Sequence, residues 1–233
     1  AIAKLFERTN LKAVALVINS PGGSPVQSAL IAQRIRDLAA EKELPLVSFC
    51  EDVAASGGYW LACAGDEIFA DANSIVGSIG VISAGFGFPD LIERFGIERR
   101  VYATGQRKGM LDPFQDEKSE DVDRLHELHQ DIFENFKTHV RDRRGDRLKA
   151  AEDTLFTGDI WTGNQALEVG LIDGLAEMRS EMRRRYGDKV KFQRAEVRRG
   201  LLSRLRGGGM SAIDPAELVS ALDDWALWKR YGL

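Results

Sequence analysis

An uninterrupted apolar run followed by a glycine-containing turn and an amphipathic segment constrains the fold of this chain most. Residues 14–18 are all apolar, and the run ends at Asn19-Ser20-Pro21-Gly22-Gly23. A short run without polar alternation is typical of a strand buried on both faces, as in a parallel sheet. Residues 25–41 then carry apolar side chains at helical spacing. This strand–turn–helix unit predicts an α/β layer fold.

The same alternation continues along the chain. Val122, Leu125, Leu128 and Ile132 recur at helical spacing and predict a long helix over residues 117–144. Further strands are predicted over residues 45–50, 67–70, 98–102 and 189–195. Further helices are predicted over residues 56–64, 89–95, 163–169 and 175–186, with a last helix from Asp214-Pro215.

The length of 233 residues, of which 44% are hydrophobic, allows one large domain with an appendage. We expect the main domain to span residues 1–195. Its N-terminus is expected to be truncated, with an upstream segment preceding Ala1. Residues 196–233 are predicted to be a basic linker containing Gly207-Gly208-Gly209 and an amphipathic helix with a stripe of Leu218, Leu222, Trp225 and Trp228.

The net charge of −4 argues against a nucleic-acid binder, but the charge is uneven. Residues 183–206 hold ten Lys and Arg against two carboxylates. This segment predicts contact with an anionic surface, such as a membrane or an acidic face of another subunit; a solvated strand and tail is the alternative. No apolar run approaches the ~20 residues that span a bilayer. Cys50 and Cys63 lie in apolar surroundings and are interpreted as core residues.

Ser56, in Ala55-Ser56-Gly57-Gly58-Tyr59-Trp60, is the candidate nucleophile, because it is flanked by glycine at the predicted start of a helix. All three histidines fall in one charged helical stretch: His126, His129 and His139. The sequence therefore gives little support for a Ser-His-Asp triad. Lys108, in Thr104-Gly105-Gln106-Arg107-Lys108-Gly109, could act as base if burial lowered its pKa. Taken singly, Ser56 could be only a helix cap and Lys108 only a loop lysine.

Acyl transfer also needs donors for the oxyanion, and backbone N–H groups at glycines are suited to this. Gly57 follows Ser56 at a helix start, where N–H groups lack helical partners. Gly23 ends the turn after the first strand. Ligand sites in open α/β sheets lie outside the carboxyl ends of the strands, where both turns are predicted to meet.

Four motifs in order resemble the signal peptide peptidase A family of Ser-Lys serine proteases. They are Asn19-Ser20-Pro21-Gly22-Gly23, Ala54-Ala55-Ser56-Gly57-Gly58-Tyr59, Val76-Gly77-Ser78-Ile79-Gly80-Val81 and Gly105-Gln106-Arg107-Lys108. The resemblance covers about residues 10–180, with the stretch Trp161 to Asp173 as a further element. It implies a ClpP/crotonase-like layered β-β-α superhelix.

The resemblance also implies residue roles. Ser56 would be the nucleophile and Lys108 the general base, with Ser78 orienting the lysine. The N–H of Gly23, helped by Gly57, would form the oxyanion hole. No cofactor or metal is expected: His126 and His129 could share a metal on one helix face, but no third ligand is evident, and a solvated face is the simpler interpretation.

The function so implied is a Ser-Lys endopeptidase that hydrolyses remnant signal peptides or other membrane-derived segments. By the same resemblance we expect a homo-oligomer, membrane-associated at a bacterial inner or cell membrane, with a soluble catalytic domain; the side of the membrane stays open. Two alternatives remain at this point. One is a crotonase-like acyl-CoA enzyme, and the other is a non-catalytic, membrane-associated scaffold.

Overall fold

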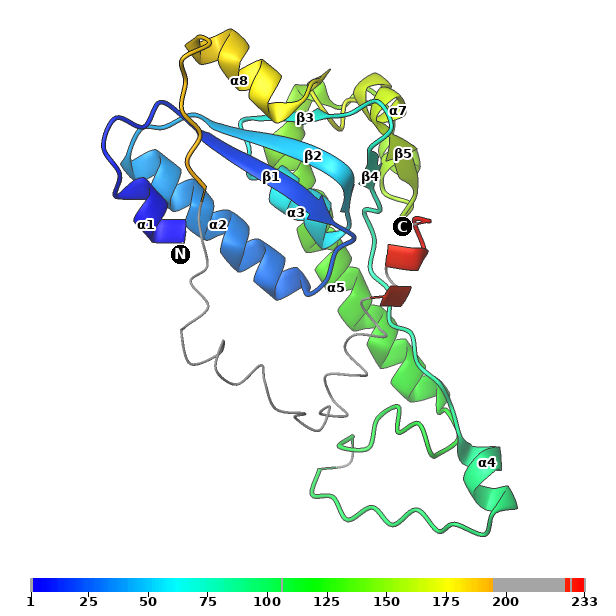
Figure 1. Ribbon diagram of the computed structural model, residues 1–233. Coiled ribbons are helices and arrows are strands. Elements are labelled where there is room, and N and C mark those ends of the chain that lie inside the picture. Colours follow the sequence, from blue (N-terminus) through cyan, green and yellow to red (C-terminus); the bar gives the residue numbers. More distant parts are fainter. Residues whose placement is uncertain (1, 106, 195–224, 227, 233) are drawn as a thin grey trace.

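The computed structural model describes residues 2–105, 107–194, 225–226 and 228–232 (Figure 1). Its helices are α1 (Ile2–Phe6), α2 (Pro25–Glu41), α3 (Gly57–Ala62), α4 (Pro89–Arg94), α5 (Ser119–Arg144), α6 (Glu152–Leu155), α7 (Gly163–Glu168) and α8 (Met178–Tyr186). Its strands are β1 (Val14–Ser20), β2 (Leu46–Ala55), β3 (Glu67–Ala70), β4 (Ile75–Gly77), β5 (Ile160–Thr162) and β6 (Gly174–Leu175).

Strand β2 is the centre of the sheet, because it pairs in parallel with β1, β3 and β4. Its first half pairs with β3, up to the pair Cys50 and Ala70, and its last residues pair with β4, up to Ala55 and Gly77. β6 extends the sheet beyond β3 in parallel, and β5 extends it beyond β4 in the antiparallel direction. The carboxyl ends of β1, β2 and β4 therefore meet at one edge.

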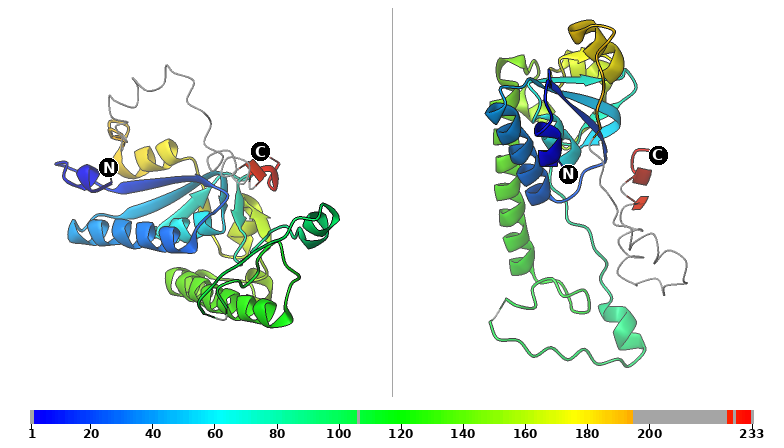
Figure 2. Two further views of the ribbon diagram at one scale, coloured as in Figure 1. Left: turned by 90° about the horizontal axis from the view of Figure 1, so that it is seen from below. Right: turned by 60° about the vertical axis from the view of Figure 1, so that its left-hand side comes forward.

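Helices cover both faces of the sheet (Figure 2). On one face α2 packs through Ile35 and Leu38 against Leu46 of β2, while α3 and α5 complete the same layer. On the other face Met182 of α8 packs against residues of β2 and β3. Successive side chains of β2 point to opposite faces of the sheet, so the helices on both faces bury all of this strand except Glu51 and Asp52. The predicted α/β layered, ClpP/crotonase-type architecture is confirmed.

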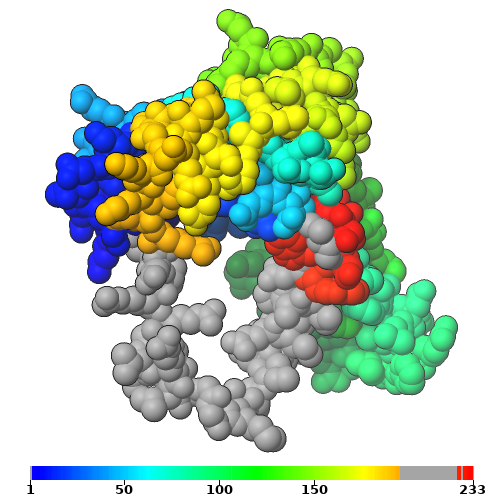
Figure 3. Space-filling model, turned by 45° about the horizontal axis from the view of Figure 1, so that its top comes forward, coloured from blue at the N-terminus to red at the C-terminus, as the bar shows by residue number. Residues whose placement is uncertain are grey.

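Residues 83–105 and 107–118 lie in an arm that extends away from the sheet and carries α4 (Figures 1 and 3). Within the arm the N–H of Phe88 donates to the Pro113 carbonyl at 2.6 Å, and the rings of Phe88 and Phe114 lie 5.7 Å apart. At its base, Ser83 Oγ lies 2.7 Å from His129 Nε2 of α5. The arm ends directly at the start of α5.

Two predicted strands are wrong. Residues 98–102 lie in the arm without strand structure, and Arg99 there pairs with Asp112 instead. Residues 189–194 run beside the sheet and are held by side chains: Arg179 lies 5.0 Å from the centre of the Phe192 ring, and Arg8 hydrogen-bonds Gln193. A strand needs a neighbouring strand to take up its N–H and C=O groups, and the described part of the sheet offers none to these segments.

The other strand and helix predictions over the described residues hold, with shifted ends, but the expected burial of β1 on both faces is wrong: only Ile18 of β1 is buried, and Val17 is 41% exposed. β2 runs five residues past the predicted end, and α8 begins three residues later than expected. Cys50 and Cys63 are buried and free, as expected of core residues, and burial raises the pKa of each thiol to about 12. Within the described ranges, no helix is both long and apolar enough to cross a membrane.

The predicted appendage falls mostly outside the described residues. Gly207-Gly208-Gly209, Leu218 and Leu222 lie there, so the proposed linker and boundary after residue 195 stay predictions. Of the expected apolar stripe, Trp225 and Trp228 are described as helical, and Trp225 is exposed.

Candidate active site

Ser56 lies at the junction between β2 and α3, at the carboxyl edge of the sheet. Its backbone has φ 51° and ψ −121°, a conformation that non-glycine residues seldom adopt. Its N–H donates to the carbonyl of Gly77 at 2.7 Å, which holds this turn against the end of β4. Strained backbone of this kind clusters at functional sites, where the surrounding structure maintains it.

The glycine turn after β1 lies directly against Ser56. A Cβ placed on Gly22 would come within 2.8 Å of Ser56 Cβ and 3.2 Å of Ser56 Oγ. A Cβ placed on Gly57 would lie 3.4 Å from the backbone N of Gly23. The structure thus brings together three of the predicted site residues, Ser56, Gly57 and Gly23. A side chain on Gly22 would collide with Ser56, whereas a Cβ on Gly23 would meet nothing within 4 Å.

Ser78 occupies the equivalent position after the neighbouring strand β4. It is half-buried, has φ 52°, and donates its N–H to the Asp159 carbonyl at 2.7 Å. Because Ala55 pairs with Gly77, Ser56 and Ser78 each follow the last paired residue of adjacent parallel strands. The turn that carries Ser78 therefore lies beside the turn that carries Ser56.

Lys108 lies elsewhere. It is exposed in the arm, beside Thr104, Gly105 and Arg107, and the views in Figures 1 and 2 place this arm well away from the end of β2. The structure of the single chain therefore does not bring Lys108 to Ser56. The predicted dyad is incomplete within one copy.

Asn19, interpreted from the sequence as a turn residue, holds the strand ends together. Its Nδ2 donates to Asp52 Oδ2 at 2.8 Å, and its Oδ1 accepts from the Val53 N–H at 3.2 Å. These bonds span the register shift between β1 and β2, after which Ser20 pairs with Ala54. The side chain thereby fixes how the glycine turn approaches Ser56.

Tyr59 anchors α3 through its side chain. The sequence had not predicted it to be a residue of the site. Its hydroxyl donates to the buried carbonyl of Leu171 at 2.7 Å, and burial raises the pKa of this phenol far above its ordinary value. The tyrosine within the Ser56 motif was a signal for this role, because a buried Tyr needs a partner for its hydroxyl.

The stretch Trp161 to Asp173 contacts β3 and β4, two strands that pair with the central strand β2. Trp161 pairs with Val76, and its ring lies against Gly77. Asp173 binds Arg144 through two hydrogen bonds of 2.7 and 3.1 Å and accepts from the Ile68 N–H at 2.7 Å. Burial alone would raise the pKa of Asp173, but the bonds and charge of Arg144 outweigh it and lower that pKa.

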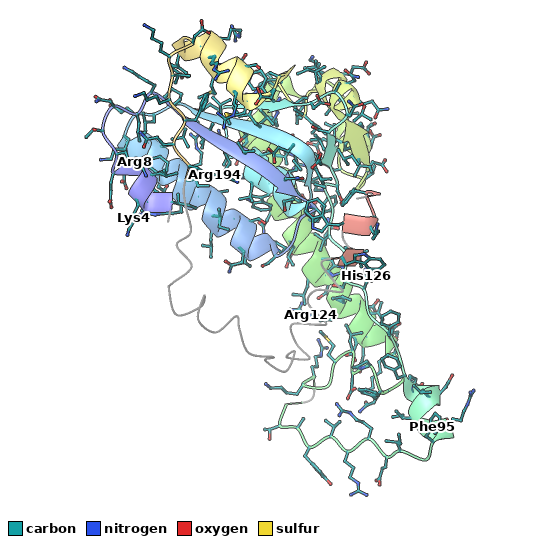
Figure 4. The ribbon with its side chains drawn as sticks, in the orientation of Figure 1. Lys4, Arg8, Phe95, Arg124, His126 and Arg194 are labelled. Carbon is teal, nitrogen blue, oxygen red and sulfur yellow. The ribbon has the colours of Figure 1, made fainter. Side chains whose placement is uncertain are left out.

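The described residues contain no group of three or more His, Cys, Asp or Glu side chains suited to a metal ion. His126 is exposed on α5, on its half nearer the arm (Figure 4), and His129 contacts Ser83. The chemistry that this arrangement supports is nucleophilic attack by a serine hydroxyl beside backbone N–H groups.

A family model described as peptidase family S49 matches residues 39–189, which include β2, α3, the arm and α5. A protein of Brucella abortus named Na⁺/H⁺ antiporter NhaA is 52% identical over 243 aligned residues, covering 100% of this chain and 33% of that protein.

Two relatives carry protease names. The putative signal peptide peptidase SppA of Enterococcus faecium is 33% identical and covers 74% of this chain and 49% of its own length. Protease 4 of Haemophilus influenzae is 32% identical, over 74% of this chain and 28% of its own. The chain spans a third to a half of the length of the first relatives that it matches.

Proposed function

The chain belongs to peptidase family S49, and from this premise we propose that it is a serine endopeptidase in which Ser56 is the nucleophile and Lys108 the general base. The observation that carries the proposal is the position of Ser56. It follows the central strand in a rare backbone conformation, beside the backbone of Gly22, Gly23 and Gly57.

In the proposed reaction, Ser56 Oγ attacks the carbonyl carbon of the scissile peptide while its proton passes to the neutral amine of Lys108. The carbonyl oxygen becomes an oxyanion that accepts hydrogen bonds from the N–H groups of Gly23 and Gly57. Lys108 then gives the proton to the leaving amine, and an acyl-enzyme remains on Ser56. Water, deprotonated by Lys108, hydrolyses that ester. Ser78 orients the lysine by a hydrogen bond.

Because Lys108 lies on the arm, we propose that it reaches Ser56 of a neighbouring copy in a homo-oligomer. The arm supports this, since it exposes large apolar side chains that soluble proteins usually cover. Phe86 is 81% exposed, Phe95 70% and Tyr102 93%. Phe95 lies on the arm far from the sheet (Figure 4), so the described strands and helices of the sheet layers do not cover it.

The substrates proposed are extended peptides, with remnant signal peptides as the leading class, because one relative is named a putative signal peptide peptidase. We also propose a membrane-associated setting. It is supported by the relative named a Na⁺/H⁺ antiporter, which aligns over the whole chain and whose named activity takes place across a membrane.

The first test is covalent labelling of the full chain with a β-lactone, followed by mass spectrometry of the peptides. An adduct on Ser56, lost in Ser56→Ala, is the expected result. Labelling elsewhere would remove Ser56 as the nucleophile, and retention of an acyl-CoA without any adduct would favour the crotonase-like alternative. Absence of both would favour a scaffold.

The second test asks whether the lysine that acts on Ser56 comes from a neighbouring copy of the chain. Lys108→Arg alone should be inactive because arginine stays protonated, and Ser56→Ala alone should also be inactive. When the two variants are co-expressed, a site formed between neighbours regains both groups in roughly one quarter of cases, so partial activity should return. No recovery would show that Lys108 does not act between copies.

A further inference from the structure

The helix that follows Ser56 is too short to hold its own orientation. α3 has six residues, and a helix of that length is not stable in isolation. The last carbonyls of any helix also lack helical partners. The placement of α3 therefore depends on the groups that bind its C-terminal end, and the described structure supplies several of them from α5.

His139 of α5 binds the carbonyl of Trp60. The N–H of Ala64, which would be the helical partner of that carbonyl, donates instead to Leu61 at 3.0 Å. His139 Nε2 lies 3.1 Å from the Trp60 oxygen and must carry the proton, because a carbonyl only accepts. Burial lowers the pKa of His139, which favours the neutral ring.

Arg143, one turn further along α5, binds the carbonyls just beyond α3. Its Nε donates to the Cys63 oxygen and its Nη2 to the Gly65 oxygen, each at 2.8 Å. A cation at the C-terminus of a helix also interacts favourably with the helix dipole. Together His139 and Arg143 bind three carbonyl groups at this end, those of Trp60, Cys63 and Gly65.

The contact continues through Trp60 to the nucleophile. The Trp60 ring is stacked on His139, with centroids 4.6 Å apart and an interplanar angle of 10°, and lies 5.0 Å from Phe136. The N–H of Trp60 donates to the Ser56 carbonyl at 3.0 Å. A displacement of Trp60 would therefore move the turn that carries Ser56 and the Gly57 N–H.

We propose that His139 and Arg143 are positioning residues, which set the orientation of Ser56 and of the Gly57 N–H through Trp60 and the C-terminal end of α3. This inference rests on the proposed function of Ser56 as nucleophile. It assigns α5 a role in addition to packing, since this helix passes directly along α3 (Figure 1).

The test measures the rate at which a β-lactone acylates Ser56 in the full chain, together with the thermal unfolding midpoint. His139→Phe keeps a ring against Trp60 but removes the donor, and acylation should slow on the order of tenfold to a hundredfold. His139→Gln keeps a donor and should recover most of the rate. Arg143→Lys keeps the charge but loses the fork that binds two carbonyls, so it should also slow acylation.

His126→Phe is the matched control, because it makes the same change at an exposed position of the same helix. It should leave the rate unchanged. Acylation of His139→Phe at the unmutated rate would overturn the proposal. If His139→Phe does not fold, His139→Asn takes its place. The asparagine side chain is one methylene shorter than the glutamine side chain of His139→Gln, so its amide should not reach the Trp60 carbonyl. Equal acylation rates for His139→Asn and His139→Gln would overturn the proposal. Failure of the unmutated chain to acylate at Ser56 would instead remove the proposed function.

Discussion

The N–H of Ser56 donates to the carbonyl of Gly77 across a distance of 2.7 Å, so the turn after the central strand is bonded to the end of the strand beside it. This bond places Ser56 and Ser78 on adjacent turns. It also helps maintain the backbone of Ser56 at φ 51°. The site thus depends on the pairing of β2 with β4 as well as on its own sequence motif.

Ser56→Ala should abolish peptide hydrolysis while the fold persists. The hydroxyl forms no cap bond within α3, so its loss removes the attacking atom and little else. By comparison with other serine hydrolases, kcat should fall on the order of 10⁴- to 10⁶-fold. Hydrolysis of a synthetic apolar peptide and circular dichroism would check both parts. Activity near the unmutated level would remove Ser56 from the mechanism.

Gly58→Ala should destabilise the fold and slow acylation of Ser56. A Cβ there would lie 2.5 Å from the backbone oxygen of Ser20, which cannot move without shifting β1. Overpacking costs about 1–3 kcal/mol, and a contact this short with backbone places the cost near the upper end, above the roughly 1 kcal/mol that alanine gains over glycine within a helix. Thermal unfolding should show the loss.

Gly85→Ala is the control for this change, since a Cβ at Gly85 meets nothing within 4 Å. Its unfolding midpoint should stay near that of the unmutated chain. Equal midpoints for Gly58→Ala and Gly85→Ala would show that α3 can move away from β1 without cost.

Asp173→Asn should lower the free energy of unfolding by about 3–5 kcal/mol, the usual cost of leaving a buried charge unpaired. Arg144, which is 2% exposed, would lose its ionised partner. Chemical denaturation at neutral pH would measure the loss. Asp153→Asn, at an exposed position, should change stability little; a comparable loss there would contradict the assignment to the buried pair.

His139 should make the fold less stable in mild acid. Its folded pKa is lowered, chiefly by burial and also by the charge of Arg143, while the Trp60 carbonyl and Asp142 oppose the shift. The unfolded chain takes up a proton near pH ~6.5, so the contribution of the neutral ring is present above that pH and is lost as pH falls through the folded pKa.

Urea denaturation at two pH values on either side of ~6 should therefore show a smaller pH dependence in His139→Gln than in the unmutated chain. His126→Gln should keep the full dependence, because that side chain is exposed. An unchanged dependence in His139→Gln would assign the acid sensitivity to other groups.

Short-range patterns in the sequence determined much of this protein. The apolar run of β1 and the helical spacing in α2 and α5 predicted those elements, because the period of apolar residues that distinguishes a strand from a helix is carried by residues close together in the sequence. The motif around Ser56 likewise identified the candidate nucleophile, since glycines beside a serine at a strand–helix junction are a local signature.

Only the tertiary structure decided which segments meet. Pairing of Ala55 with Gly77 brings Ser78 beside Ser56, and Asp173 meets Arg144 from a distant part of the chain. Residues 98–102 carry a strand-like sequence but have no described partner strand. Lys108 lies on the arm, away from Ser56 of the same chain. The physical reason is that backbone pairing and burial of charge depend on neighbours distant in sequence, which local propensity does not specify.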